Sequence, residues 1–221
     1  SKAKDSAGAD PLILRNEVVG IKRSGDVYRL TVQERDGNKY NFDSRIVINC
    51  GGLHSDKNAI NAGIDIDRSG YRLFFCKGEY FRVSSKHTGR INHLIYPVPA
   101  HAGLGVHVTL ELDGSMKLGP NTIWLPGNVF DYSVDDSHRK EFFEAAKEYL
   151  PFLDIEDLQP DQAGIRPKLF GPGMAKRDFV ISEESSKGLP GLINLIGIES
   201  PGLTASPAIG KYVREIVDEI L

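Results

Sequence analysis

The stretch LIGIESPGLTASPAIGKYVREIV, residues 195–217, joins an apolar segment to a long helical pattern through a turn rich in Gly, Ser and Pro. Its apolar start, within GLINLIG, predicts a buried strand. Pro207 falls in the early helical turns, where a missing N–H costs little. A helix N-terminus offers free N–H groups and a positive dipole to an anion, whereas many such turns carry glycine only for backbone reasons. The residues alone leave both interpretations open. The apolar stripe of the helix is formed by Ala208, Ile209, Tyr212, Val213, Ile216, Val217 and Ile220.

A second joint of this kind is RIVINCGGLHSDKNAINAGI, residues 45–64. RIVINC is apolar without alternation, which predicts a strand of a parallel sheet that is covered on both faces. Two glycines and a helical rhythm follow, so the segment predicts a βα unit.

The remaining patterns predict antiparallel strands and one further amphipathic helix, at residues 137–153. The expected strands are residues 11–23, 26–34 and 39–43, which form a small meander, and residues 71–85, 93–100, 103–120 and 178–184. The composition shifts near Arg68, which is the candidate domain boundary. These elements together predict an α+β fold.

Composition excludes several classes of protein. The 221 residues carry a net charge of −3, so no basic surface for nucleic acid or anionic lipid is expected. The sequence has neither a long apolar run nor a signal-like segment, which predicts a cytoplasmic location. Cys50 and Cys76 lie in apolar runs and are expected to be buried thiols. His87, His93 and His101 lack ligand spacing, so no metal site is expected.

Several motifs carry a family resemblance: RIVINCGGLHSD, KGEYF, IYPVP, LGVHVTLELDGSMKLGP, AGIRPKL, DFVI and INLIGIESPGLTASPAIG. In this order, from about Leu12 onward, they resemble the D-amino-acid-oxidase-like superfamily of FAD-dependent oxidoreductases. Within it, the resemblance is greatest to L-2-hydroxyglutarate dehydrogenases and oxidases. The block from Gly105 to Pro120 is its most specific part.

The resemblance implies a partial FAD-binding, Rossmann-like domain and an antiparallel substrate-binding sheet with helices on one face. Residues 1–68 and 186–221 would belong to the first and residues 69–185 to the second. The family pattern begins with GxGxxG, which receives the FAD pyrophosphate, and these residues do not contain it. The chain thus resembles the C-terminal portion of such an enzyme, and we expect it to lack autonomous activity.

The resemblance also implies which residues approach FAD. Backbone groups near Val18 and Val19 would contact the adenine, and Gly51 and Gly52 would allow close approach of the backbone to the cofactor. The turn before the last helix would face the flavin ring and ribityl chain, through Gly197, Ile198, Gly202, Leu203 and Thr204.

For the substrate, Arg166 matches the arginine that binds the substrate carboxylate in related amino-acid oxidases. Its alternative role is a surface ion pair. His54 and His107 are candidate proton acceptors, although a strand histidine is often only structural. Tyr80 and Tyr96 are candidates for the distal carboxylate, or half-buried sheet residues.

The intact enzyme would then oxidise L-2-hydroxyglutarate to 2-oxoglutarate by hydride transfer to FAD. The alternatives are a related amino-acid or glycerol-3-phosphate oxidoreductase, or a noncatalytic fragment that binds a partner chain. An apolar sheet without its neighbouring strands is also expected to favour self-association.

Overall fold

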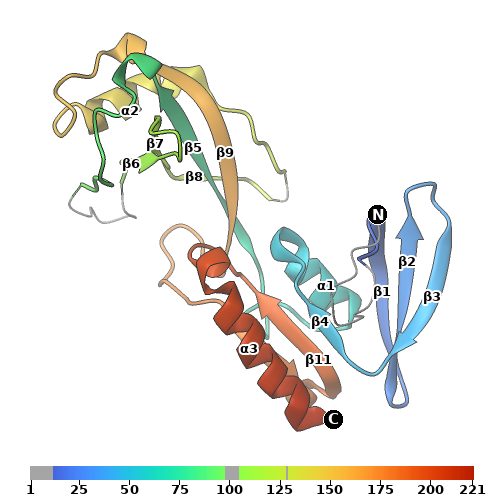
Figure 1. Ribbon diagram of the computed structural model, residues 1–221. Helices are drawn as coiled ribbons and strands as arrows, with labels where there is room; N and C mark the ends of the chain where they lie inside the picture. The colour runs from blue at the N-terminus through green and yellow to red at the C-terminus, as the bar shows by residue number, and fades with distance from the viewer. Residues whose placement is uncertain (1–11, 98–104, 128) are drawn as a thin grey trace. The chain divides into compact units, whose positions relative to one another are not determined.

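The computed structural model describes residues 12–97, 105–127 and 129–221. The chain divides into two compact units (Figure 1). Unit 1 comprises residues up to Leu73 and from Lys176 onward, and unit 2 comprises Phe74–Ala175. The boundaries expected after residues 68 and 185 differ from these, because the segments beside them make their contacts within unit 1.

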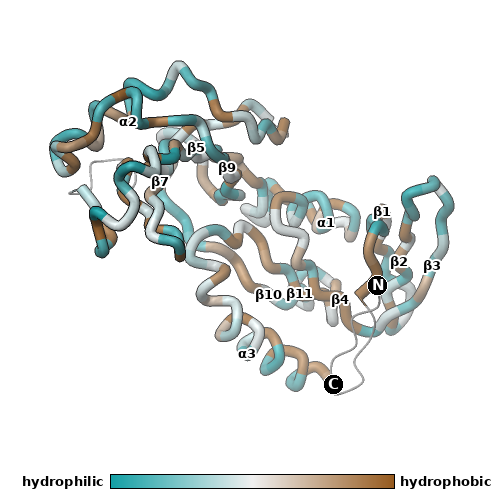
Figure 2. Tube along the Cα trace, turned by 45° about the horizontal axis from the view of Figure 1, so that its top comes forward, coloured by the Kyte–Doolittle hydropathy of each residue, from teal (hydrophilic) through white to brown (hydrophobic). Residues whose placement is uncertain are grey.

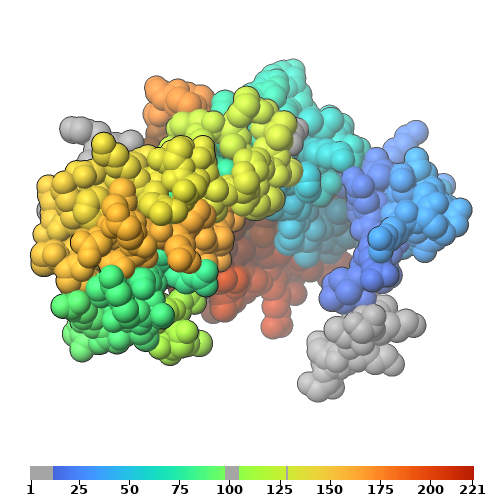
Figure 3. Space-filling model, turned by 90° about the horizontal axis from the view of Figure 1, so that it is seen from above, coloured from blue at the N-terminus to red at the C-terminus, as the bar shows by residue number. Residues whose placement is uncertain are grey.

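Unit 1 begins with an antiparallel meander in the order β1-β2-β3, as the alternating sequence predicts. Its strands are β1 (Asn16–Ser24), β2 (Val27–Glu34) and β3 (Lys39–Ser44). The hydroxyl of Tyr28, a buried residue of β2, donates to the Pro190 carbonyl at 3.0 Å, which ties the meander to the rest of the unit. Helix α1 (Ser55–Asn61) contacts β1, and their blue and cyan surfaces adjoin in Figure 3.

The second sheet of unit 1 has the order β10-β11-β4, from β10 (Val180–Glu184), β11 (Leu189–Ile196) and β4 (Val47–Asn49). Strand β11 runs parallel to β4 and antiparallel to β10. The segment around β10, expected in the substrate-binding sheet, therefore belongs to this one. Strand β4 forms one edge, where Ile48 is 44% exposed.

Helix α3 (Gly202–Ile220) packs along β11 (Figure 1). Val213 of α3 meets Ile193 and Leu195 of the strand, so the apolar stripe of the helix covers this face. Figure 2 shows the apolar course of β11 and the mixed hydropathy of α3. No helix in the described part of the chain is long and apolar enough to cross a membrane.

A buried chain of polar side chains joins the strands of this sheet. Asn49 Nδ2 donates to Asn194 Oδ1 at 2.8 Å, and Asn194 Nδ2 donates to Glu184 Oε1 at 2.9 Å. Glu184 also accepts from the Tyr71 hydroxyl at 2.8 Å and pairs with Lys187. These partners hold Tyr71 and Glu184 in unit 1, on the other side of the boundaries expected from the sequence.

Unit 2 is built around one antiparallel sheet with the order β6-β7-β5-β8, in which β9 also pairs with β5. The strands are β5 (Phe74–Val83), β6 (His107–Leu110), β7 (Met116–Gly119), β8 (Ile123–Trp124) and β9 (Leu158–Lys168). Helix α2 (Arg139–Ala146) is shorter than the helix predicted over residues 137–153. Short 3-10 helices complete the fold: η1 (Gly52–His54), η2 (Ser85–His87), η3 (Asp136–His138), η4 (Ile155–Asp157) and η5 (Ser185–Lys187).

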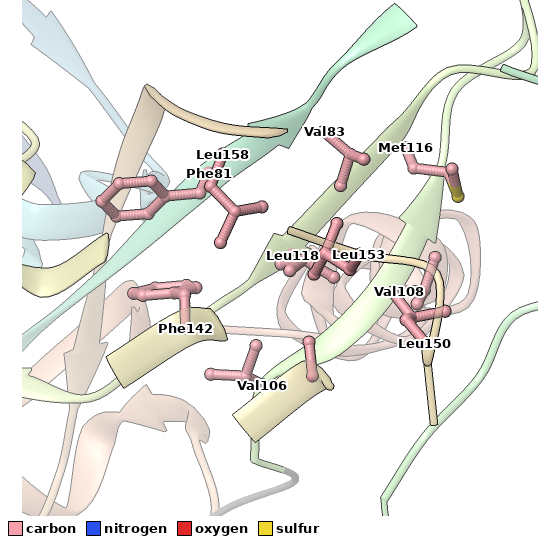
Figure 4. Close-up of a cluster of buried hydrophobic side chains, with 11 residues drawn as sticks. Phe81, Val83, Val106, Val108, Met116, Leu118, Phe142, Leu150, Leu153 and Leu158 are labelled. Atoms are coloured by element: carbon pink, nitrogen blue, oxygen red, sulfur yellow. The ribbon is translucent and has the colours of Figure 1, made fainter. Parts of the chain in front are cut away.

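The hydrophobic core of unit 2 lies between this sheet and α2 (Figure 4). The rings of Phe81 and Phe142 pack with their centroids 4.7 Å apart, and both side chains are fully buried. Leu150 is also fully buried although α2 ends at Ala146, because the chain continues in turns beneath the sheet. Cys76 is buried as expected, whereas Cys50 is exposed at the end of β4.

A cluster of charged residues is buried in unit 2 around Glu79. Its carboxylate accepts from His138 Nδ1 at 2.6 Å and pairs with Lys77 at 3.2 Å. Burial alone would raise the pKa of Glu79, but hydrogen bonds led by the one from His138 outweigh burial and lower it. The same bond to Glu79 raises the pKa of His138. Glu79 and His138 therefore stabilise each other's charged forms.

The buried amide chain predicts a stability effect at Asn194. Asn194→Ala removes one partner each from Asn49 and Glu184, and we expect a loss of about 2 kcal/mol in the free energy of unfolding. Asn41→Ala removes an exposed hydrogen bond to Thr31 and should change it by less than about 0.5 kcal/mol. Urea denaturation of both variants checks this, and equal losses would contradict it.

The Glu79–His138 pair predicts a pH effect. Because the pKa of His138 is raised in the folded state, its stabilisation is complete below about pH 6.5 and is lost as pH rises through the folded pKa. We expect His138→Gln to reduce the fall in unfolding free energy between pH 6 and pH 9. His93→Gln, which changes an exposed loop residue, is the control. An unaltered slope in His138→Gln would rule out this linkage.

Candidate functional site

The turn between β4 and α1 requires both of its glycines. A Cβ on Gly51 would lie 2.6 Å from Asn58 Nδ2, and Gly52 has a φ of +55°, which favours glycine. The Gly51 N–H donates to Asn49 Oδ1 at 3.1 Å, so the buried amide chain reaches this turn. His54 lies next to it as the N-cap residue of α1. The residues expected to approach the cofactor from RIVINCGG thus form one compact turn.

The turn between β11 and α3 has the same character. Gly197 has a φ of +72°, and a Cβ on Gly202 would lie 2.4 Å from Ile198 Cγ2. A surface pocket is lined by residues 198–204, which include the expected Ile198, Gly202, Leu203 and Thr204. Leu203 is 91% exposed at the start of the helix. An apolar side chain so exposed beside helical N–H groups suits contact with a partly apolar, partly anionic ligand.

Helix α3 starts earlier than the apolar stripe suggests, so Pro207 lies inside it. Proline cannot donate to the carbonyl four residues earlier, which belongs to Leu203. The hydroxyl of Ser206 donates to that carbonyl at 2.8 Å instead. The first turn of the helix therefore keeps its hydrogen bonding beside the pocket.

Val18 and Val19 lie in β1, at the edge of the meander. The pairing with β2 shifts between Val18 and Gly20, which makes Val19 a bulge. A bulge releases backbone groups from the ladder, as a backbone contact to a ligand requires.

In unit 2, Arg166 of β9 is half-buried and is held by backbone carbonyls. Its Nη2 donates to the Asn121 carbonyl at 2.8 Å and to the Lys77 carbonyl at 3.3 Å, and Nε donates to the Cys76 carbonyl at 3.4 Å. No carboxylate of the described residues forms an ion pair with it, so the surface ion pair considered as its alternative role is not found there. Arg166 is a fixed cation with its charge uncompensated by these residues.

Tyr80, Tyr96 and His107 lie on the same face of this sheet as Arg166, opposite the core. The ring of Tyr96 stacks on His107 with centroids 4.5 Å apart. A Cβ on Gly119, which pairs with His107, would lie 2.8 Å from the Tyr80 ring. Burial raises the pKa of the Tyr80 hydroxyl despite the positive charges of Arg166 and Lys117. These groups form a polar patch of aromatic and cationic side chains.

The sequence did not single out Lys117, Asn121 or Glu79. Lys117 joins this face but is neutralised by Glu111 at 2.9 Å and Asp161 at 3.0 Å. The signal for Glu79 was present, because KGE places two charges inside an apolar run. Nothing in the sequence distinguished Asn121 from a turn residue.

No three His, Cys, Asp or Glu side chains that could hold a metal converge within residues 12–97, 105–127 and 129–221. His101 lies outside the described residues. The candidate site residues therefore form two sets. The first is the glycine turns of unit 1, with His54, and the second is the Arg166 face of unit 2.

Known proteins match between 63% and 100% of this chain. L-2-hydroxyglutarate dehydrogenase, mitochondrial, from Arabidopsis thaliana is 43% identical over 147 residues, which cover 63% of this chain and 30% of the relative. Glycerol 3-phosphate dehydrogenase from Caloramator mitchellensis is 29% identical and covers 95% of this chain and 40% of its own length. L-2-hydroxyglutarate dehydrogenase from Escherichia coli K12 is 27% identical and covers 100% of this chain and 58% of its own length. The chain thus matches between 30% and 58% of the length of these relatives.

Solved structures show the same fold. Dithionite-reduced L-α-glycerophosphate oxidase from Mycoplasma pneumoniae, with FAD bound, superposes with a TM-score of 0.74 at 24% identity, and covers 92% of this chain and 50% of that one. L-proline dehydrogenase from P. horikoshii gives a TM-score of 0.68 at 18% identity, with 92% and 50% covered.

The model of the DAO family, described as FAD dependent oxidoreductase, matches residues 5–216. The expected α+β fold and the resemblance read from the sequence motifs are confirmed. This chain belongs to the DAO family of FAD-dependent oxidoreductases.

Proposed function

We propose that this chain supplies the substrate-binding face and part of the FAD site of an enzyme that oxidises a 2-hydroxy acid, most specifically L-2-hydroxyglutarate. The observation that carries the proposal is Arg166, a half-buried cation that contacts carbonyl oxygens only. A buried charge is costly without a counter-charge, so the site favours an anionic ligand. The guanidinium keeps Nη1 for such a ligand, and a charged N–H donor to a carboxylate oxygen forms a strong hydrogen bond.

His107 is proposed to accept the proton of the substrate hydroxyl. Its Nδ1 lies 3.2 Å from the Gly105 carbonyl, which favours a proton on that nitrogen and a lone pair on Nε2. Stacking on Tyr96 fixes the plane of the ring. His54, beside the glycine turn of unit 1, is the second candidate. Tyr80 and Tyr96 are proposed to donate to the distal carboxylate.

The residues of unit 1 fit contact with FAD because glycines shape the backbone at both strand-turn-helix joints: Gly51 and Gly202 permit close packing within the turns, and Gly52 and Gly197 have positive φ. Gly51, Gly52, Gly197 and Gly202 would allow the approach, with Ile198, Leu203 and Thr204 lining the pocket and backbone groups near Val18 and Val19 at the adenine. FAD when bound would supply the acceptor for the hydride removed from C2. The N-terminus of α3 would favour negative charge beside it.

The substrate preference rests on relatives named L-2-hydroxyglutarate dehydrogenase, one of them 43% identical over 147 residues. A phosphate would also pair with Arg166, and relatives named for glycerol 3-phosphate keep that substrate as the second candidate.

The expected cytoplasmic location stays a prediction, and the Arabidopsis relative is named as mitochondrial. Self-association through the edge of β4, or binding to a partner chain, also stays a prediction.

The role of Arg166 is tested with Arg166→Ala in the full-length protein that contains this chain. Loss of a buried charged contact costs about 2–5 kcal/mol, so binding should weaken strongly, and poor orientation should slow turnover as well. Arg166→Lys should recover only part, because an ammonium has three donors where the guanidinium has five and cannot serve the same carbonyls and a ligand together. The measurement is anaerobic flavin reduction by L-2-hydroxyglutarate and by glycerol 3-phosphate, with FAD content measured on the same samples.

The matched control is Arg29→Ala, which removes the same charge from an exposed pair with Asp43 in the meander. It should leave both kinetics and FAD content unchanged. If L-2-hydroxyglutarate reduces the flavin of Arg166→Ala at the wild-type rate, the proposed carboxylate site is eliminated. If glycerol 3-phosphate reduces the wild-type protein and L-2-hydroxyglutarate does not, glycerol 3-phosphate becomes the proposed substrate.

The flavin role of the α3 turn is tested with Gly202→Ala. The added methyl would lie 2.4 Å from Ile198 Cγ2, so the turn or the side chain must move, and FAD occupancy should fall. Gly210→Ala in the same helix meets nothing within 4 Å and should retain FAD. Absorbance near 450 nm per mole of purified protein measures the occupancy. Equal flavin content in the two variants would remove this turn from the proposed site.

A further inference from the structure

We infer that Asn121 is a positioning residue for Arg166, fixing the orientation of the guanidinium that receives the substrate carboxylate. The inference rests on the proposed function, which assigns the carboxylate to Arg166. It begins from the shortest contact of the guanidinium, the 2.8 Å hydrogen bond from Nη2 to the Asn121 carbonyl. Since that acceptor belongs to a turn between β7 and β8, the turn must itself be held in place.

Glu79 holds this turn through two hydrogen bonds to the Asn121 side chain, one from its backbone N–H and one to its carboxylate. The Glu79 N–H donates to Asn121 Oδ1 at 2.8 Å, and Asn121 Nδ2 donates to Glu79 Oε2 at 3.2 Å. Asn121 is buried and Glu79 fully so. The amide side chain therefore has both its donor and its acceptor engaged by one residue, which allows a single orientation of the turn.

Glu79 is in turn anchored by the charged cluster described above. Its carboxylate contacts His138 Nδ1, the Lys77 ammonium and the Asp135 N–H, the last at 3.2 Å. Removing the Asn121 side chain leaves these contacts in place. A variant at Asn121 therefore tests the connection to Arg166 without dismantling the cluster.

Gly78 completes the arrangement, because it leaves the space in which the guanidinium lies. A Cβ at this position would be 2.8 Å from Arg166 Nη2 and 2.7 Å from the Pro120 side chain. Three neighbouring features thus restrict one side of the guanidinium: the gap at Gly78, the Asn121 carbonyl and the strand carbonyls. Nη1 donates to no described residue, which leaves it available to a ligand.

The experiment is a double-mutant cycle on the full-length protein, with 2-oxoglutarate binding followed by titration calorimetry. Asn121→Ala should weaken binding about tenfold when Arg166 is present. In an Arg166→Ala background the same substitution should change the Kd by less than about twofold, because the positioned group is gone. An equal loss in both backgrounds, or no loss in the first, would overturn the inference.

A second variant guards against a folding defect in Asn121→Ala. Gly78→Ala should weaken 2-oxoglutarate binding in the same Arg166-dependent way. Its control is Gly164→Ala on the paired strand β9, directly opposite Gly78, where a Cβ meets nothing within 4 Å. Indistinguishable binding by the two alanine variants would count against the restricted space.

The order of the arginine side chain is also measurable without ligand. The Nε–H resonance of Arg166, assigned by its loss in Arg166→Lys, should be protected from exchange in the wild type and in Gly164→Ala, and lose protection in Asn121→Ala. Unchanged protection in Asn121→Ala would overturn the inference whatever the substrate. If Arg166→Ala leaves 2-oxoglutarate binding unaffected, the proposed function fails separately.

Discussion

The hydrogen bond between the side chains of Asn49 and Asn194 joins the two strands that lead to both glycine turns of unit 1. Strand β4 is only three residues long, and little ladder pairing holds it against β11. The amide pair adds a side-chain connection at the end of that ladder, and Asn49 extends it to the Gly51 N–H. A buried network of this kind stabilises the fold only if its members are satisfied together. The geometry of the proposed cofactor contacts therefore depends on a few amides and on Glu184 behind them.

In unit 2, buried charged side chains hold the residues of the proposed site in place. Its sheet has an apolar face packed on α2 and an opposite face that carries Arg166, Tyr80 and His107. Glu79 belongs to β5 of this sheet. Both oxygens of its carboxylate accept hydrogen bonds, and its backbone N–H donates to Asn121 Oδ1. Arg166 by contrast receives only carbonyl contacts. The buried negative charge is thus compensated inside the protein, whereas the positive charge is left for a ligand.

The sequence predicted the elements whose physics is local. Apolar periodicity located the two strand-turn-helix joints and the meander, and the family motifs led to Arg166 and the glycine turns. The segment of β10 was expected in the substrate-binding sheet of unit 2, whereas it lies in the second sheet of unit 1. An isolated strand pattern carries no information about the strand with which it pairs. The burial of Cys50 was wrong, since an apolar run does not reveal that β4 is an edge strand. Asn121 was not recognisable, because its importance lies in contacts with Glu79 and Arg166, which are distant in sequence.

The substitute hydrogen bond at the start of α3 makes Ser206 and Pro207 interdependent. A hydroxyl at position 206 supplies what the proline at 207 withholds from the Leu203 carbonyl. Losing the hydroxyl alone leaves that exposed carbonyl to solvent, whereas losing the proline alone returns a backbone N–H to it. A residue with an N–H at position 207 would therefore satisfy the Leu203 carbonyl without help, and the side chain at position 206 would be free to serve another partner.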